Sequence, residues 1–342
     1  MKGWQDPLNL PVRLPSKLPL AKRGTHPVPT AGAVVGPSYV ISSTKFGTLA
    51  IPNSKTRSKK VVFHSDQVIY DAVYSMDINR NRWVPPAQGQ DQLNAAQLLF
   101  LGCSIVFGEG VGDSETLPAR AQAYAPGFRA VNFALPGWGP ANIALATGSD
   151  EYGYRAPQDS RNRKKNQAVY VYIDDHMRRL VAPLSMYRGG SRWMYVIPYY
   201  DVDSRGRLIE PTPGVMIPQG QPVRHFLLTW LSKSEFLRWM NFEWPTRYGD
   251  HEFERMAAVL AKIQENIRAR GFENLTVAFY PGSNSQYLVP YLNSRGIRTL
   301  DYSKVDLADF VSGPVTLRDG HPSPGTHDFL AKQIVNDLDL TH

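Results

Sequence analysis

The fold is decided by the stretch LLFLGCSIVFGEGVGDSETLPA, residues 98–119. It begins as a continuous apolar run, which is typical of a strand that is buried on both faces of a parallel sheet. The run stops at Gly102, Cys103 and Ser104, and three glycines follow before the sequence becomes helical. Such a stop either makes a tight turn or carries the hydroxyl of Ser104 to the edge of a sheet. Which of these two interpretations holds depends on other parts of the sequence.

Short apolar runs and helical segments alternate from this stretch to the end of the chain. Strands that alternate with helices favour a parallel sheet with helices on both faces. The sequence therefore predicts one α/β domain over residues 91–342. Its expected strands are residues 97–102, 128–135, 167–173, 275–280 and 297–302, and its clearest helices are residues 251–272 and 325–338.

Two regions depart from this alternation. Residues 1–90 begin with many prolines and basic residues and then alternate apolar and polar residues, so we expect an extended arm followed by a β-rich region. At about residues 185–250 we expect an insertion, made of a β-hairpin that turns at residues 204–206 and of one or two apolar helices. Long insertions at the carboxyl ends of strands usually shape a substrate site.

Composition limits the classes of partner. With 342 residues, of which 42% are hydrophobic, the chain can bury a large core. The net charge of +8 favours an acidic partner such as an anionic glycan or a membrane surface. No nucleic-acid motif occurs, so no nucleic acid is expected. No apolar run approaches the roughly 20 residues of a membrane span, so stable membrane insertion is not expected either.

The cysteine content and the N-terminus narrow the compartment and the kind of site. Cys103 is the only cysteine, which excludes an intrachain disulfide and a zinc site built on several thiolates. Residues 1–24 lack the uninterrupted apolar segment of a secretory signal. We expect either a periplasmic or cell-envelope protein whose export signal is absent from this chain, or a cytoplasmic protein. No cofactor is expected, and the oligomeric state is left open.

The strand ends and one late loop carry side chains that could do chemistry together. Ser104 follows the first strand, and Asp319 and His321 lie on the loop before the last helix. A serine hydroxyl needs a base that takes its proton and a third group that orients the base, and His321 and Asp319 suit these roles. A tetrahedral intermediate also needs N–H donors worth about 3 kcal/mol each, which a glycine such as Gly137 can present closely.

Three stretches in this order resemble the conserved blocks of the SGNH (GDSL-like) hydrolase superfamily. They are FLGCSIVFGEGVGDSETLPA (residues 100–119), NFALPGWGP (132–140) and DGHPSPGTH (319–327). The resemblance covers about residues 95–342. It implies a flavodoxin-like three-layer α/β/α domain with a central parallel sheet. It also implies the activity of an esterase, a lipase, a polysaccharide deacetylase or an O-acetyltransferase.

Carried onto this sequence, the resemblance makes Ser104 the nucleophile and its own N–H an oxyanion donor. Gly137 matches the glycine that supplies a second donor, His321 matches the base, and Asp319 matches its partner. The family offers an oxyanion asparagine in a further block where this chain has Asp174, whose carboxylate can serve only if it is protonated. The Asp-to-His spacing is one residue shorter than the commonest form, which leaves a Ser–His dyad open. The predicted substrate-binding residues are Gly108, Trp138, Asp175 and His176.

The sequence thus predicts a serine esterase that forms an acyl-enzyme and acts on small acyl esters, above all acetyl groups on a carbohydrate or cell-envelope glycan. Two alternatives with the same fold stay open, namely an O-acetyltransferase and a catalytically weak protein that binds glycans through the aromatic insertion. An α/β-hydrolase elbow is disfavoured because Val106 stands where that motif needs glycine. A metal hydrolase could draw on Asp174, Asp175, His176, Asp319 and His321.

Overall fold

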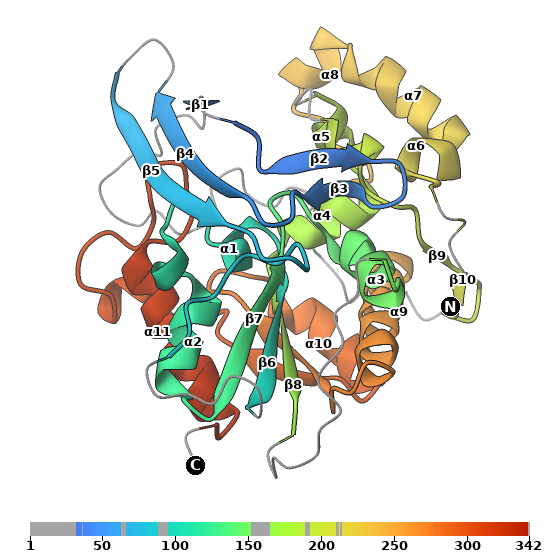
Figure 1. Cartoon of the computed structure of the whole chain (residues 1–342). Coiled ribbons are helices and arrows are strands. Elements are labelled where there is room, and N and C mark those ends of the chain that lie inside the picture. Colours follow the sequence, from blue (N-terminus) through green and yellow to red (C-terminus); the bar gives the residue numbers. More distant parts are fainter. Residues whose placement is uncertain are drawn as a thin grey trace.

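A parallel sheet lies at the centre of the molecule, helices cover its two faces, and antiparallel strands cross one of its ends (Figure 1). The computed structural model describes residues 32–35, 37–62, 66–87, 95–151, 165–188, 192–209, 212 and 214–340. The extended arm predicted before residue 32 lies outside the described residues. Within them, no helix combines the length and the apolar character needed to cross a bilayer.

The central sheet has five parallel strands in the order β12-β11-β8-β6-β7. Numbered along the chain, this order is 2-1-3-4-5, which is the flavodoxin-like arrangement. Every residue of β6 is buried, as its continuous apolar run predicts. The predicted α/β fold is therefore confirmed. The strands are β6 (Ala96–Gly102), β7 (Phe128–Ala134), β8 (Gln167–Tyr172), β11 (Leu275–Phe279) and β12 (Arg298–Asp301).

Helices form the two outer layers. On one face α2 (Leu117–Tyr124) packs against α11 (Pro324–Asp337), and on the other α3 (Pro140–Gly148) packs against α9 (Asp250–Arg268), which in turn contacts α10 (Ser285–Asn293) (Figure 1). The apolar side of α9 is buried, as its amphipathic pattern predicts. Two short helices, α1 (Ser104–Phe107) and α4 (Asp175–Val181), begin directly after strands β6 and β8, and η2 (Asp113–Glu115) and η4 (Leu307–Asp309) are 3-10 helices.

The N-terminal region is rich in β-strands, as predicted. Strands β1, β4 and β5 form an antiparallel sheet, and β2 and β3 form a hairpin. Both lie across the end of the central sheet at which α1 and α4 begin (Figure 1). This placement brings N-terminal side chains to the edge where ligands of parallel sheets bind. The strands are β1 (Gly32–Val35), β2 (Val40–Ser43), β3 (Gly47–Ala50), β4 (Lys55–Val62) and β5 (Val68–Ser75).

The segment between β8 and α9 contains the predicted hairpin and apolar helices. Strands β9 and β10 pair antiparallel around the turn at residues 203–206. Helices α7 and α8 lie at the outside of the molecule, beyond β2 and β3 (Figure 1). The elements of this segment are α5 (Leu184–Arg188), η3 (Arg192–Tyr195), β9 (Asp201–Val202), β10 (Leu208–Ile209), α6 (Ile217–Gly220), α7 (Pro222–Ser232) and α8 (Glu235–Trp239).

Candidate active site

Ser104 lies at the carboxyl end of β6 and begins α1. Strand β6 is buried throughout, so the chain emerges at the sheet edge and turns at once into the short helix. The side chain of Ser104 is largely buried, and its hydroxyl makes no hydrogen bond to any other residue in the described part of the chain. Its backbone carbonyl accepts hydrogen bonds from the N–H groups of Gly108 and Glu109, both at 3.0 Å.

Asp319 and His321 form a close pair on the loop before α11. The Oδ2 atom of Asp319 lies 3.1 Å from Nδ1 of His321, and the backbone N–H of His321 donates to Oδ1 at 3.3 Å. The carboxylate of Asp319 has no solvent exposure. The two-residue spacing between Asp319 and His321, although shorter than the commonest form, therefore still allows the carboxylate to face the imidazole. The structure brings these two predicted residues together.

Two charged residues that sequence reasoning missed complete this cluster. Glu109 places Oε2 3.4 Å from Nε2 of His321 and also accepts a hydrogen bond from the Tyr70 hydroxyl at 3.4 Å. Lys60 of β4 donates to Asp319 Oδ2 at 2.9 Å. An acid five residues after Ser104, inside a glycine-rich loop, could have been noticed in the sequence. Nothing in the sequence marks Lys60, because its role depends on how β4 lies against the α/β domain.

The charges of this cluster shift the pKa values of its members. Burial opposes ionisation of Asp319, but His321 and Lys60 outweigh it and hold the pKa of the carboxyl well below its usual range. Burial also opposes protonation of His321, yet the Asp319 and Glu109 carboxylates raise its pKa above the ordinary value of 6.5. An imidazole between two carboxylates is a strong base, and its protonated form is stabilised.

No hydrogen bond joins the side chains of His321 and Ser104, both of which the structure describes. The Nε2 atom of His321 faces Glu109, and the Ser104 hydroxyl has no partner among the described residues. Glu109 contacts both residues, through its backbone N–H to the Ser104 carbonyl and through its carboxylate to the His321 imidazole. Ser104 and His321 thus share Glu109 as a neighbour without forming the hydrogen bond of a closed triad.

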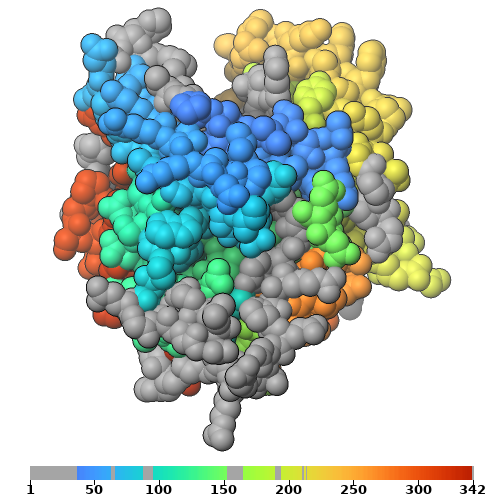
Figure 2. All heavy atoms as spheres, viewed as in Figure 1, coloured from blue at the N-terminus to red at the C-terminus, as the bar shows by residue number. Residues whose placement is uncertain are grey.

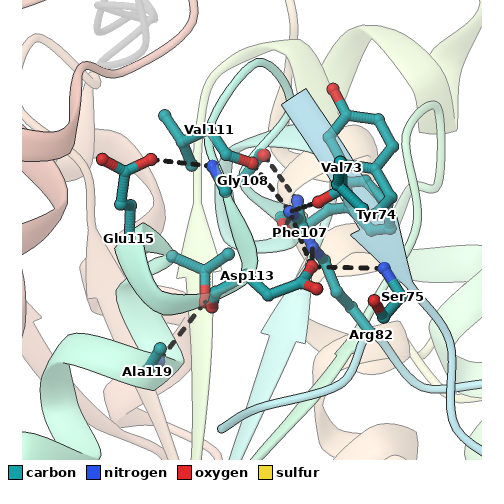
Figure 3. A network of polar contacts seen from close by, with 12 residues as sticks. Val73, Tyr74, Ser75, Arg82, Phe107, Gly108, Val111, Asp113, Glu115 and Ala119 are labelled. Carbon is teal, nitrogen blue, oxygen red and sulfur yellow. Dashed lines mark hydrogen bonds and ion pairs between the residues drawn. The ribbon is translucent and has the colours of Figure 1, made fainter. Parts of the chain in front are cut away.

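The loop that carries Glu109 is held by the buried side chain of Arg82 (Figure 3). The guanidinium donates to the carbonyls of Phe107, Gly108 and Val111 at 2.8, 2.6 and 2.7 Å, and it pairs with Asp113 at 3.1 Å. Gly108 itself is buried, with φ at +78°, and a Cβ there would lie 2.7 Å from Thr116 Cγ2. These features indicate a role for Gly108 in loop geometry and give no support to its predicted contact with substrate.

Gly137 and Trp138 follow strand β7, and the structure gives them different environments. Gly137 follows β7 with φ at +86° and is partly exposed, so its N–H stays a candidate donor. Trp138 is only 1% exposed, and its indole N–H donates to the carbonyl and hydroxyl oxygens of Thr48 at 3.2 and 3.1 Å. The structure gives no support to the expectation that Trp138 binds substrate, because the ring is buried and hydrogen-bonds to Thr48 of the β2–β3 hairpin.

The carboxylate of Asp174 accepts two hydrogen bonds from Asn284, which follows β11. Its Oδ1 accepts the Asn284 backbone N–H at 3.0 Å, and its Oδ2 accepts the side-chain amide. Burial raises the pKa of Asp174, although the two hydrogen bonds from Asn284 oppose this shift. A carboxylate that accepts from Asn284 on both oxygens offers no donor to an oxyanion, so the structure gives no support to that predicted role.

Asp175 and His176 also have partners of their own. Asp175 pairs with Arg178 at 2.8 Å and with Arg179 at 2.7 Å. His176 is completely buried, and its Nδ1 lies 2.8 Å from the Tyr170 hydroxyl. Burial holds the pKa of His176 well below the ordinary value. The structure gives no support to the expectation that His176 binds substrate, and the five residues of the predicted metal site are divided among separate clusters.

Comparisons with known proteins find likeness in structure only. No protein-family model matches the sequence, and no curated protein matches it. Among solved structures, the chain is similar to a lipolytic G-D-S-L family protein from Desulfitobacterium hafniense DCB-2, at 10% identity and a TM-score of 0.37, over 70% of this chain and 98% of that chain. It is also similar to a member of the same family from Veillonella parvula DSM 2008, at 11% identity and a TM-score of 0.37, over 71% and 98%.

Proposed function

We propose that the protein is a serine esterase that cleaves small acyl esters, above all acetyl esters of a carbohydrate, through an acyl group on Ser104. The observation that carries this proposal is the double contact of Glu109. Its backbone N–H binds the Ser104 carbonyl at 3.0 Å, and its carboxylate lies 3.4 Å from Nε2 of His321. Because Glu109 adjoins both Ser104 and His321, it supports the proposal that the Ser104 hydroxyl and the His321 imidazole act together at the carboxyl end of β6.

In the proposed reaction, Nε2 of His321 takes the proton of Ser104 while Oγ attacks the acyl carbon. The tetrahedral intermediate collapses, the leaving alcohol takes the proton from Nε2, and the acyl group remains on Oγ. Water then attacks the acyl carbon with His321 again as the base, which releases the acid and restores Ser104. Asp319 orients Nδ1, and the N–H groups of Ser104 and Gly137 are the proposed oxyanion donors.

Glu109 has to leave Nε2 before the base can act. Hydrogen bonds of catalytic residues are often long or poorly aligned in free enzymes and tighten when substrate binds. We infer that the substrate displaces the Glu109 carboxylate, which turns toward the Tyr70 hydroxyl that it already contacts. Glu109 then acts as a positioning residue that sets the basicity of His321, while Lys60 keeps Asp319 ionised.

Removing the charge of Glu109 should move the pH dependence of the esterase. His321 works as a base only when it is neutral, so a raised pKa places the acid limb of kcat/KM above pH 6.5. Glu109→Gln removes one of the two carboxylates that raise this pKa, so the acid limb should shift to lower pH. The profile with p-nitrophenyl acetate measures the shift. Glu115→Gln in the same loop is the control, and an unshifted limb in Glu109→Gln would contradict the assignment.

One observation favours a second function, a metal-dependent hydrolase. Ligand atoms of Glu109, Asp319 and His321 all lie within 4.8 Å of one another, a set that a divalent cation could bind. Against it, the ammonium group of Lys60 already lies 2.9 Å from Asp319 Oδ2, which repels a cation. The serine esterase is therefore the better supported function.

Inhibition distinguishes these two functions. We expect ester hydrolysis to survive a chelator at a concentration that strips divalent ions and to be abolished by a serine-directed phosphonate. The measurement is the initial rate with p-nitrophenyl acetate after each treatment. Loss of the rate with the chelator, its recovery with added Zn²⁺ or Mn²⁺ and indifference to the phosphonate would establish the metal hydrolase instead.

A further inference from the structure

The two outermost helices of the insertion carry an apolar face that the proposed chemistry does not use. Leu228, on the inner side of α7, is fully buried. On α8 the rings of Phe236 and Trp239 lie 6.1 Å apart, and Trp239 is 81% exposed. Positions three and four residues apart share one side of a helix, so each helix presents a single stripe. The outer aromatic stripe consists of Val223, Phe226, Leu227 and Trp230 of α7 with Phe236, Trp239 and Met240 at α8.

All seven residues of this stripe are exposed, and they lie on two consecutive helices that contact each other. In the space-filling view, α7 and α8 form an outer corner of the molecule (Figure 2). Phe226 is 71% exposed and Trp230 is 68% exposed. Single exposed apolar residues are common, whereas a contiguous apolar patch marks a surface that is covered in use.

The charges around the stripe indicate what covers it. Residues 217–249 contain four Lys or Arg residues against two Asp or Glu residues, in a chain of net charge +8. Of the two acids, Glu235 is paired with Arg238 at 2.8 Å, and Glu243 accepts a backbone hydrogen bond from Ser185 at 2.9 Å. Lys233, between the helices, is exposed. We therefore expect the partner that covers the stripe to have an apolar interior and an anionic edge.

We propose that the outer aromatic stripe binds the surface of an anionic lipid bilayer, with α7 and α8 lying in the plane of the interface. Helices of this kind carry Trp, Phe and Leu on one face and basic residues beside it, and they bury the apolar face at the boundary of headgroups and acyl chains. Tryptophan is enriched at that depth because its ring is amphipathic. The stripe supplies Trp230 and Trp239, and the exposed Lys233 supplies charge for anionic headgroups.

Sedimentation of the full chain with lipid vesicles tests this proposal. We expect binding to vesicles of phosphatidylcholine mixed with phosphatidylglycerol, and weaker binding to phosphatidylcholine alone. The double variant Trp230→Ser/Trp239→Ser should lower the partition coefficient about tenfold or more, because it removes two large apolar anchors. Lys233→Gln should lower it about fivefold, and only on the anionic vesicles. The matched control is Ile78→Ser/Phe310→Ser, which removes two similarly exposed apolar residues elsewhere and should bind like the unmodified chain.

Three results would overturn the proposal. The first is equal partitioning of the double variant and the control. The second is sedimentation velocity without lipid that shows a dimer which only the double variant loses, because a second copy of the chain would then cover the stripe. The third is glycan binding that only the double variant loses. Hydrolysis of soluble p-nitrophenyl acetate should be unchanged in all these variants, so the lipid result can be interpreted whether or not the esterase proposal stands.

Discussion

Replacing Ser104 by alanine should lower the turnover of p-nitrophenyl acetate by at least about a thousandfold. The proposed reaction forms its covalent bond at this hydroxyl, and loss of a catalytic serine removes most of the rate that a hydrolase of this kind provides. Folding should be unaffected, because the hydroxyl has no hydrogen-bond partner in the part of the chain that is described. The measurement is kcat/KM together with a thermal unfolding curve.

Ser283→Ala is the matched control for this substitution. Ser283 lies just beyond the end of β11, a strand of the same sheet, and, like Ser104, is 8% exposed. Its hydroxyl donates only a long hydrogen bond, at 3.4 Å, to the carbonyl of Tyr172. The control variant should keep kcat/KM within a few-fold of the unmodified protein. Comparable activity in Ser104→Ala and Ser283→Ala would remove Ser104 from the mechanism.

Replacing Arg82 by methionine should lower the free energy of unfolding by about 3–5 kcal/mol, because it removes one partner of a buried ion pair. The change leaves the Asp113 carboxylate without its cation and removes the guanidinium donor from the carbonyls of Phe107, Gly108 and Val111. The loss should appear as a lower midpoint in urea unfolding. A variant too unstable to purify would agree with the same expectation.

Activity should fall with stability in this variant, because Arg82 holds the loop that carries Glu109 (Figure 3). The control is Arg57→Met, which removes an exposed arginine that pairs with Asp71 on the surface of the β4–β5 sheet. Exposed ion pairs contribute little, so the control should unfold at nearly the same urea concentration as the unmodified protein. If both variants unfolded alike, the buried arginine would not be the anchor of the loop.

The sequence was sufficient to predict the architecture because the strands are short and buried. The apolar run that ends at Gly102 can satisfy its backbone only inside a sheet, and the amphipathic helix over residues 250–268 requires a sheet face to cover. The resemblance to SGNH hydrolases added the order of the strands, which the pattern alone does not give. The pairing of Asp319 with His321 was also predictable, because one short loop carries both residues.

The remainder of the site depends on contacts between distant segments. Lys60 reaches Asp319 only because β4 lies across the end of the central sheet, and no local pattern encodes that placement. Trp138 and His176 were predicted to bind substrate because each lies soon after a strand end. The turn after a strand decides whether a side chain points outward, and here both side chains point into the core.

The most direct test of the central claim is mass spectrometry of the protein after reaction with a fluorophosphonate ester. The account predicts one adduct, located on Ser104 by peptide mapping, formed together with loss of esterase activity. The adduct should form far more slowly in His321→Ala, which lacks the base. Complete inhibition with the adduct on another residue, or full labelling of Ser104 with activity retained, would contradict the account.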